Sequence, residues 1–177
     1  MSDTLTAPAT TTEPTSPVFD PRAYRDVMGA FPSGVTVITT LGDDGPVGFT
    51  CQSFYSVSID PPLVSFSIAR TSRSLAAVRA HRSVVVNFLS ADQQHLSAQF
   101  GRSGTDKWAG VAWSPSPCCG TPVLDGAAGW VAGQIDREIE AGDHVIFLVR
   151  VSAIQDDSSR QPLVFHRGAY RELEYMI

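Results

Sequence analysis

The sequence lacks the features that mark most secreted, membrane-spanning and nucleic-acid-binding proteins. It has three cysteines in 177 residues, and an odd count with two adjacent members (Cys118 and Cys119) fits neither a disulfide framework nor a zinc site. No apolar run reaches the roughly 18 residues that a membrane helix needs. The 13 Lys and Arg against 18 Asp and Glu give a net charge of -5, without the basic excess of nucleic-acid surfaces. We therefore predict a protein of the reducing cytoplasm with no metal, membrane or nucleic-acid partner.

Several catalytic signatures are also missing. The sequence contains no Gly-x-Gly-x-x-Gly motif, no Walker phosphate-binding loop and no Ser-centred nucleophile elbow. Its four histidines do not show the spacing of metal ligands. An enzyme with these gaps needs a cofactor to supply its reactivity.

The composition is nevertheless that of a folded domain. Hydrophobic residues make up 43% of the chain and charged residues 18%, which is enough apolar material for one core. Residues 1–18 are rich in Thr, Pro and Ser and lack the basic start and apolar centre of a secretory signal. We expect residues 1–18 to form a disordered leader and residues 19–177 to form a single domain.

Hydrophobic periodicity predicts a mainly β protein with short helices. A first helix is expected after Asp20-Pro21, with an apolar stripe made of Tyr24, Val27, Met28 and Phe31. Strands are predicted at residues 35–41, 47–57, 63–69, 83–89, 130–140, 144–154, 163–166 and 169–173. Short helices are predicted at residues 72–80 and after the capping-box pair Ser90 and Gln93, and residues 101–129 have the composition of a loop. Because tight turns exclude parallel pairing, we expect a closed antiparallel barrel with helices at its ends.

Residues 70–74 (RTSRS) place two arginines and three hydroxyl side chains beside the start of a predicted helix. Helix starts favour anions, and Arg adds forked charge-assisted hydrogen bonds, so this segment is a candidate phosphate site. A solvated turn with an ordinary helix cap is the other interpretation. If Arg70 holds a phosphate, Arg70→Ala should weaken ligand binding by about 1–3 kcal/mol.

Two further segments supply polar groups. Thr50, Cys51, Gln52 and Ser53 interrupt an apolar strand, which suits either the edge of a heterocycle or the solvent face of an edge strand. In residues 63–69 the apolar residues alternate with small ones, which predicts a second strand with a small polar side. Three such segments together indicate a site for a flat, polar-edged, phosphorylated ligand, and we interpret that ligand as a flavin.

In these segments the sequence resembles the flavin reductase-like family, the small reductase components of two-component flavin-dependent monooxygenases. The resemblance covers about residues 24–171. It lies in residues 31–37 (FPSGVTV), 50–54 (TCQSF), 56–64 (SVSIDPPLV), 70–74 (RTSRS), 86–87 (VN), 142–144 (GDH) and 165–170 (FHRGAY). Family members often have small residues where Cys51 and Gln52 stand. Gln52 could alter the affinity for flavin, so the resemblance does not decide between a tightly bound flavin and one that is released as a substrate.

The resemblance implies a fold and an activity. The implied fold is an antiparallel split β-barrel with Greek-key connections, of the FMN-binding split-barrel type, in a homodimer. The implied activity is hydride transfer from NADH or NADPH to FMN or FAD, after which the reduced flavin leaves for a partner monooxygenase. A flavin or haem carrier module without turnover, on the same barrel, is the alternative hypothesis.

The resemblance also implies roles for individual residues. The residues implied to contact the isoalloxazine and ribityl parts of the flavin are Ser33, Gly34, Val35, Thr36, Thr50, Cys51, Gln52 and Ser53. Those implied to lie near the phosphate end or elsewhere along the flavin are Ser67, Ala69, Arg70, Ser72, Arg73, Asn87 and Phe88. On the open side, where the nicotinamide stacks, the implied residues are His144 and Tyr170. Hydride transfer between stacked rings needs alignment and charge stabilisation rather than a protein acid or base, which agrees with the missing catalytic signatures.

Overall fold

Strands dominate the computed structural model, which describes residues 19–173 of the chain, so the predicted leader lies outside the described residues. The strands of the main sheet are β2 (Thr36–Gly42), β3 (Gly45–Cys51), β4 (Tyr55–Ser58), β5 (Leu63–Ala69), β6 (Ser83–Phe88), β9 (Gly129–Ala141) and β10 (His144–Asp156). They are joined in the order β3-β2-β6-β9-β10-β5-β4, with antiparallel pairing throughout. The predicted antiparallel architecture is therefore confirmed.

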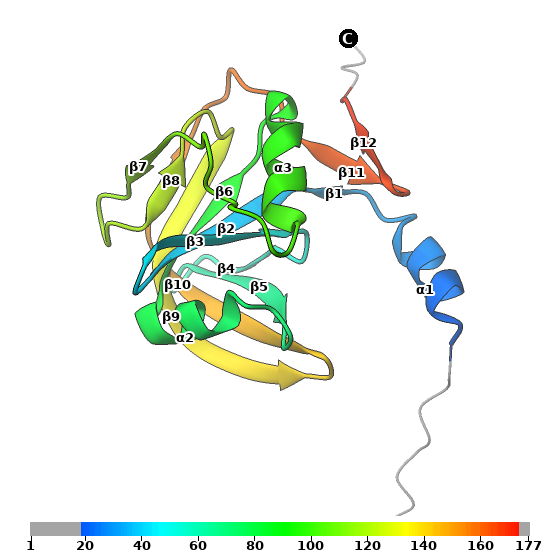
Figure 1. Ribbon diagram of the computed structural model, residues 1–177, viewed down its shortest axis with the longest axis horizontal. Helices are drawn as coiled ribbons and strands as arrows, with labels where there is room; N and C mark the ends of the chain where they lie inside the picture. The colour runs from blue at the N-terminus through cyan, green and yellow to red at the C-terminus, as the bar shows by residue number, and fades with distance from the viewer. Residues whose placement is uncertain (1–18, 174–177) are drawn as a thin grey trace, which may run out of the picture.

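The main sheet curls until its two ends approach each other, as the ribbon in Figure 1 shows. At this seam the backbone amide of Ser67 on β5 donates to the hydroxyl of Ser53, just after β3, over 3.0 Å. The Cys51 thiol at the end of β3 lies 3.5 Å from the Ser67 carbonyl oxygen. Side chains close the barrel here, because residues 52–54 leave the strand. The prediction of one strand over residues 47–57 was therefore wrong, since β3 ends at Cys51 and β4 begins at Tyr55.

Smaller elements complete the fold. The helices are α1 (Pro21–Met28), α2 (Leu75–His81), the short 3-10 helix η1 (Ala91–Gln93) and α3 (Gln94–Gly101). A three-stranded sheet consists of β1 (Ser33–Gly34), β11 (Val164–His166) and β12 (Ala169–Arg171), and a separate hairpin of β7 (Trp113–Pro115) and β8 (Pro122–Leu124). The hairpin lies in residues 101–129, which were predicted to be loop, because strands of three residues are too short to show a periodic pattern. Among the described residues, no helix combines the length and apolar character needed to cross a bilayer.

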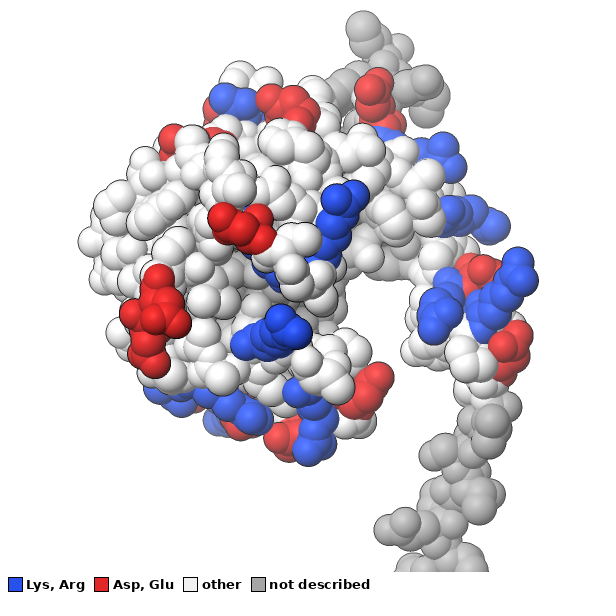
Figure 2. Space-filling view, viewed as in Figure 1, with Lys and Arg blue, Asp and Glu red and all other residues white. Residues whose placement is uncertain are grey.

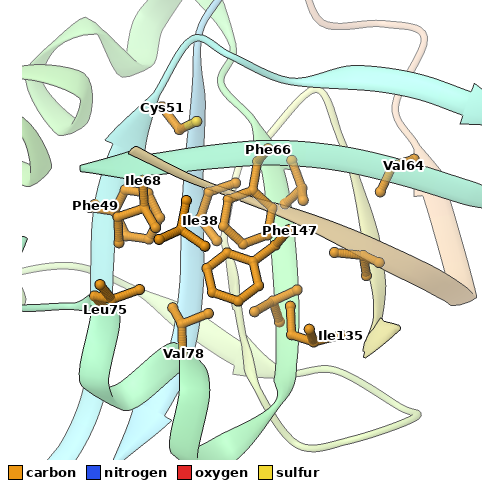
Figure 3. Close-up of a cluster of buried hydrophobic side chains, with 14 residues drawn as sticks. Ile38, Phe49, Cys51, Val64, Phe66, Ile68, Leu75, Val78, Ile135 and Phe147 are labelled. Carbon is orange, nitrogen blue, oxygen red and sulfur yellow. The ribbon is translucent and has the colours of Figure 1, made fainter. Parts of the chain in front are cut away.

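The main core fills the inside of the curled sheet. The rings of Phe66 and Phe147 stack with centroids 5.5 Å apart, and Val78 of α2 packs against the same cluster (Figure 3). The predicted alternation of β5 is confirmed, because Val64, Phe66 and Ile68 are buried while their neighbours are partly exposed. Cys51 lies at the edge of this cluster, where the core meets the site described below.

A second cluster packs α3 against the outer face of the β2–β3 hairpin. Val37 and Ile38 are adjacent on β2 and both are fully buried, Val37 in the second cluster and Ile38 in the first. Phe100 of α3 comes so close to β3 that a Cβ on Gly48 would lie 2.7 Å from its ring. Glycine at this position therefore lets α3 dock tightly, which fixes where the loop after α3 begins.

Helix α1 differs from the rest of the fold. Asp20 caps it as predicted, since its carboxylate accepts hydrogen bonds from the amides of Arg22 and Ala23. None of its residues is buried, and Val27 keeps 65% of its surface exposed. The predicted apolar stripe thus exists but is not covered by the described part of this chain.

Candidate functional site

A cleft of about 1200 Å³ opens between the end of β3, the turn before α2 and the loop after α3. Lys and Arg atoms lie above and below the hollow at the centre of the face in Figure 2, which corresponds to the space between α3 and α2 in Figure 1. Ligand pockets in proteins usually measure about 300–1000 Å³, so the cleft has room for a nucleotide-sized molecule.

One wall of the cleft carries small hydroxyl groups tied to one another; we call residues 50–53 together with Ser67 the hydroxyl wall. The hydroxyls of Ser53 and Ser67 lie 2.6 Å apart, and the Thr50 hydroxyl donates to the Ser97 carbonyl of α3 over 2.7 Å. These bonds fix the wall between the barrel seam and α3. A wall of hydroxyl and amide groups held in place offers donors and acceptors to the edge of a heterocycle such as an isoalloxazine.

Cys51 belongs to this wall but is not equipped to act as a nucleophile. Burial raises the pKa of its thiol, although hydrogen bonding to Ser53 opposes the shift. A neutral, 5% exposed thiol supplies shape and a weak donor rather than thiolate chemistry.

The predicted phosphate segment divides between the cleft and the outer surface. Thr71, Ser72, Arg73 and Ser74 line the cleft. Arg70 does not line it, and its guanidinium forms an ion pair with Glu140 at 3.0 Å. Arg73 has no ion-pair partner within residues 19–173, so its charge is free to meet an anion.

The opposite wall is the loop of residues 103–108, which we call the Lys107 loop and which the sequence analysis did not select. The Lys107 ammonium donates to the Phe100 carbonyl over 2.8 Å and to the Gly48 carbonyl over 3.3 Å. Burial lowers the pKa of Lys107. The Trp108 ring packs edge-on against Phe100 at 5.0 Å. A Ser-Gly-Thr-Asp-Lys run between two aromatic residues was the only signal for this wall in the sequence.

His144 lines the cleft at the first position of β10, opposite Ala69 of β5. Its Nδ1 atom lies 2.8 Å from a carboxylate oxygen of Asp143, and this hydrogen bond lowers the pKa of Asp143. The contact orients a half-exposed imidazole at the mouth of the cleft. It suits a planar ring that stacks from the open side.

The structure brings together nine of the residues selected from the sequence. They are Thr50, Cys51, Gln52, Ser53, Ser67, Ala69, Ser72, Arg73 and His144. The other eight lie outside the lining of the cleft, and they are Ser33, Gly34, Val35, Thr36, Arg70, Asn87, Phe88 and Tyr170.

These eight residues lie apart from the cleft for identifiable reasons. Val35 and Asn87 are buried, and the Asn87 amide is occupied by the Val37 carbonyl at 3.1 Å and the Leu124 amide at 2.8 Å. Phe88 packs against Phe54 with ring centroids 5.1 Å apart. Their side chains therefore hold strands together.

Others among the eight support the hydroxyl wall from behind or from its edge. The Thr36 hydroxyl donates to the Cys51 carbonyl over 2.7 Å, and the Tyr170 hydroxyl donates to the Ser97 hydroxyl over 2.9 Å. On β1, next to Gly34, the Ser33 hydroxyl accepts a hydrogen bond from Gln52 at 3.4 Å. These residues act on the position of the wall. Within the part of the chain that the structure describes, no group of three or more His, Cys, Asp or Glu side chains could hold a metal ion.

Comparison with known proteins gives a consistent result. The model of a family described as "Flavin reductase like domain" matches residues 28–174. The reductase subunit HsaB of a flavin-dependent monooxygenase from Rhodococcus jostii is 43% identical over 155 residues, which are 88% of this chain and 79% of that protein. An NADH:FMN oxidoreductase of Rhodococcus erythropolis is 43% identical over 151 residues, which are 83% of this chain and 79% of that protein. The Streptomyces globisporus NADH:FAD oxidoreductase SgcE6, solved with NAD and FAD fragments, has a TM-score of 0.83 at 32% identity, covering 90% of this chain and 98% of that one.

Proposed function

Because this chain belongs to the flavin reductase-like family and has its antiparallel split β-barrel, we propose that it is an NAD(P)H:flavin oxidoreductase. It takes a hydride from NADH or NADPH, passes it to FMN or FAD, and supplies the reduced flavin to a partner monooxygenase. The observation that carries the proposal is the cleft itself, lined by the hydroxyl wall and by Arg73, which has no ion-pair partner among residues 19–173.

The residues that line the cleft fit a flavin. The hydroxyl wall offers donors and acceptors to the ring edge, while Arg73 and Ser72 offer a cation and a hydroxyl to a phosphate. The bound flavin supplies the hydride-accepting chemistry that the protein lacks. The protein's own work is to hold the ring against a fixed wall and leave the other face accessible.

His144 marks the accessible side. We assign it the positioning of the nicotinamide, because Asp143 holds its imidazole at the mouth of the cleft. Alignment of two rings at near-contact distance accounts for a large part of the rate in such a reaction. No proton-transferring residue is required at that step, so His144 acts by stacking and orientation.

We further propose that the protein is a homodimer of the reducing cytoplasm. The uncovered stripe of α1 supports the dimer, because Tyr24, Val27 and Met28 each expose more than half of their surface. Edge strand β4 adds a second exposed apolar region, with Tyr55 at 69% and Val57 at 43%. Exposed apolar surface of this extent marks interaction sites. All three cysteines are free, which supports a reducing compartment.

A steady-state assay tests the enzyme proposal. Purified protein is mixed with NADH or NADPH and with FMN, FAD or riboflavin, and nicotinamide oxidation is followed by absorbance. Turnover with at least one pair supports the proposal and identifies the preferred substrates. If no pair is turned over and the protein instead retains a coloured cofactor through purification, the carrier hypothesis replaces it. Light scattering on a size-exclusion column tests the dimer in the same preparation.

A further inference from the structure

The tip of the β7–β8 hairpin carries two adjacent thiols outside the lining of the cleft. The turn is closed by hydrogen bonds from the Ser116 amide to the Thr121 carbonyl, at 2.8 Å, and from the Gly120 amide to the Ser116 carbonyl, at 3.0 Å. Gly120 has a φ of 70°, which this turn requires and which residues other than glycine rarely adopt. The backbone therefore holds Cys118 and Cys119 in a defined turn.

The two thiols have different surroundings. The Cys119 sulfur is half-buried and lies 3.1 Å from the Ser116 hydroxyl and 2.6 Å from the Thr121 hydroxyl. The Cys118 side chain is exposed, and its sulfur lies 3.5 Å from that of Cys119. Hydroxyl donors stabilise a thiolate, so Cys119 has the surroundings of a nucleophile and Cys118 those of a nearby second thiol.

The pKa values of the two thiols shift in opposite directions, as their surroundings lead one to expect. Burial alone would raise the pKa of Cys119, but the hydrogen bonds from Ser116 and Thr121 outweigh it and lower that pKa. Burial and the neighbouring Cys119 raise the pKa of Cys118. The first thiol to ionise is thus the one held between two hydroxyls.

We propose that Cys118 and Cys119 form a peroxide-reactive dithiol that closes reversibly into a disulfide between the two neighbouring residues. The Cys119 thiolate attacks one oxygen of hydrogen peroxide, the O–O bond breaks, and the departing hydroxide takes a proton to become water. The sulfenic acid left on Cys119 is then attacked by the Cys118 sulfur. The S–O bond breaks, and the hydroxide leaves with the Cys118 proton as a second water. Two thiols are oxidised and one peroxide is reduced.

Reversibility follows from the spacing. Adjacent Cα atoms are about 3.8 Å apart, closer than the roughly 4.4–6.8 Å of ordinary disulfides, so the bond is strained and easily reduced. A labile disulfide of this kind suits a reducing cytoplasm. The inference rests on the proposed function only for the source of the oxidant, because reduced flavin that reaches dioxygen yields hydrogen peroxide. The test below adds peroxide directly and does not depend on flavin turnover.

Peptide mass spectrometry of the full-length native protein tests the proposal. Trypsin places Cys118 and Cys119 together in residues 108–137 and Cys51 in residues 26–70, so the buried thiol serves as an internal control. After limited hydrogen peroxide, residues 108–137 should lose two mass units and regain them with dithiothreitol, while Cys51 stays reduced. Oxidation of Cys51 first, or disulfides only between chains, would overturn the proposal.

Three variants separate the two sulfurs. Cys118→Ser should trap a sulfenic acid on Cys119 that dimedone labels, and Cys119→Ser should leave Cys118 unlabelled under the same conditions. Thr121→Val keeps the shape of a buried side chain but removes one hydroxyl, and should slow Cys119 oxidation about fivefold, the effect of one hydrogen bond. Equal labelling of both single-cysteine variants, with unchanged far-UV circular dichroism, would contradict the assigned roles.

Discussion

The two walls of the cleft are built in different ways. The hydroxyl wall lies on strands β3 and β5 and on the residues just after β3, and Ser53 and Ser67 bond to each other across the barrel seam. The Lys107 loop has no strand to hold it and is tied to α3 and β3 by side chains: the Lys107 ammonium reaches the Gly48 and Phe100 carbonyls, the Trp108 ring packs on Phe100, and the Gln99 amide donates to the Lys107 carbonyl over 3.0 Å. The sheet and the bonds across its seam therefore fix one side of the site, while side chains from α3 and from the loop itself fix the other.

This difference shows which part of a flavin each wall can serve. A wall tied into the sheet keeps its donors in place without a ligand, which favours recognition of a rigid ring. A loop held by side chains rather than by strand pairing opens more easily than a wall tied into the sheet. We expect the hydroxyl wall to set affinity and the Lys107 loop to control entry and release.

The largest effect should come from the free cation of the cleft. Arg73→Ala removes the one arginine of residues 70–74 that lines the cleft and should weaken FMN binding about 30-fold, or about 2 kcal/mol, as loss of a charged hydrogen bond does. Flavin fluorescence titration measures it. Arg70→Ala is the matched control, because Arg70 pairs with Glu140 outside the cleft and its loss should leave affinity unchanged. If Arg70→Ala weakened FMN binding more than Arg73→Ala, Arg70 rather than Arg73 would bind the phosphate.

A smaller effect is expected at Gly48 of β3, which packs beside Phe100 and whose carbonyl accepts a hydrogen bond from Lys107. Gly48→Ala places a Cβ 2.7 Å from the Phe100 ring and should lower the unfolding free energy by about 1–2 kcal/mol through overpacking. Urea denaturation measures the change. Gly101→Ala is the control, since its Cβ would meet Thr50 at an ordinary 3.7 Å and alanine suits a helix better. Equal stability of both variants would show that α3 is not held against β3 as described.

The hydrogen bonds of the Lys107 ammonium should contribute about 1 kcal/mol to the unfolding free energy at neutral pH, and Lys107→Met removes them. Its pH dependence has a definite sign. Burial lowers the pKa of Lys107 below its ordinary 10.5, so the unfolded chain binds more protons between the two values. The unfolding free energy of the wild type relative to Lys107→Met should therefore rise with pH in the window that ends near pH 10.5. A flat difference in urea titrations would place the ammonium in water, and a falling one would show that its hydrogen bonds outweigh burial and raise the pKa; either result would contradict the expected direction.

An effect of similar size is expected on the open side of the cleft. His144→Ala removes a ring that stands at the mouth beside Asp143 and should raise the KM for reduced nicotinamide about fivefold, or about 1 kcal/mol. The flavin Kd should stay within a factor of two, because the hydroxyl wall and Arg73 are untouched. Steady-state kinetics at saturating flavin separates the two constants. A loss of flavin affinity with unchanged KM would move His144 to the flavin side.

The sequence predicted the fold where patterns are local. The alternation of β5 and the β-branched run of β6 identified their strands, and the tight turn at Gly142 joined β9 to β10. The cap at Asp20 and the bond from the Ser90 amide to Gln93 were also local signals that the structure confirms. Short-range chemistry of this kind needs no knowledge of distant partners.

The features that the sequence did not reveal depend on contacts between distant residues. Nothing near Thr50–Ser53 in sequence shows that Ser67 will close the barrel seam, so the break after Cys51 was missed. Arg70 and Arg73 look equivalent until Glu140 on another strand pairs with Arg70. Lys107 gained its place only because Gly48 and Phe100 meet between β3 and α3. Tertiary pairing therefore decides which of several similar side chains enters the cleft.

The most direct measurement is a crystal structure of the protein soaked with FMN or FAD. The ring should lie in the cleft against Thr50–Ser53, with its phosphate within hydrogen-bonding distance of Arg73 and its free face toward His144. Flavin bound elsewhere on the molecule, or a cleft that stays empty at saturating flavin while the protein turns over, would contradict the account.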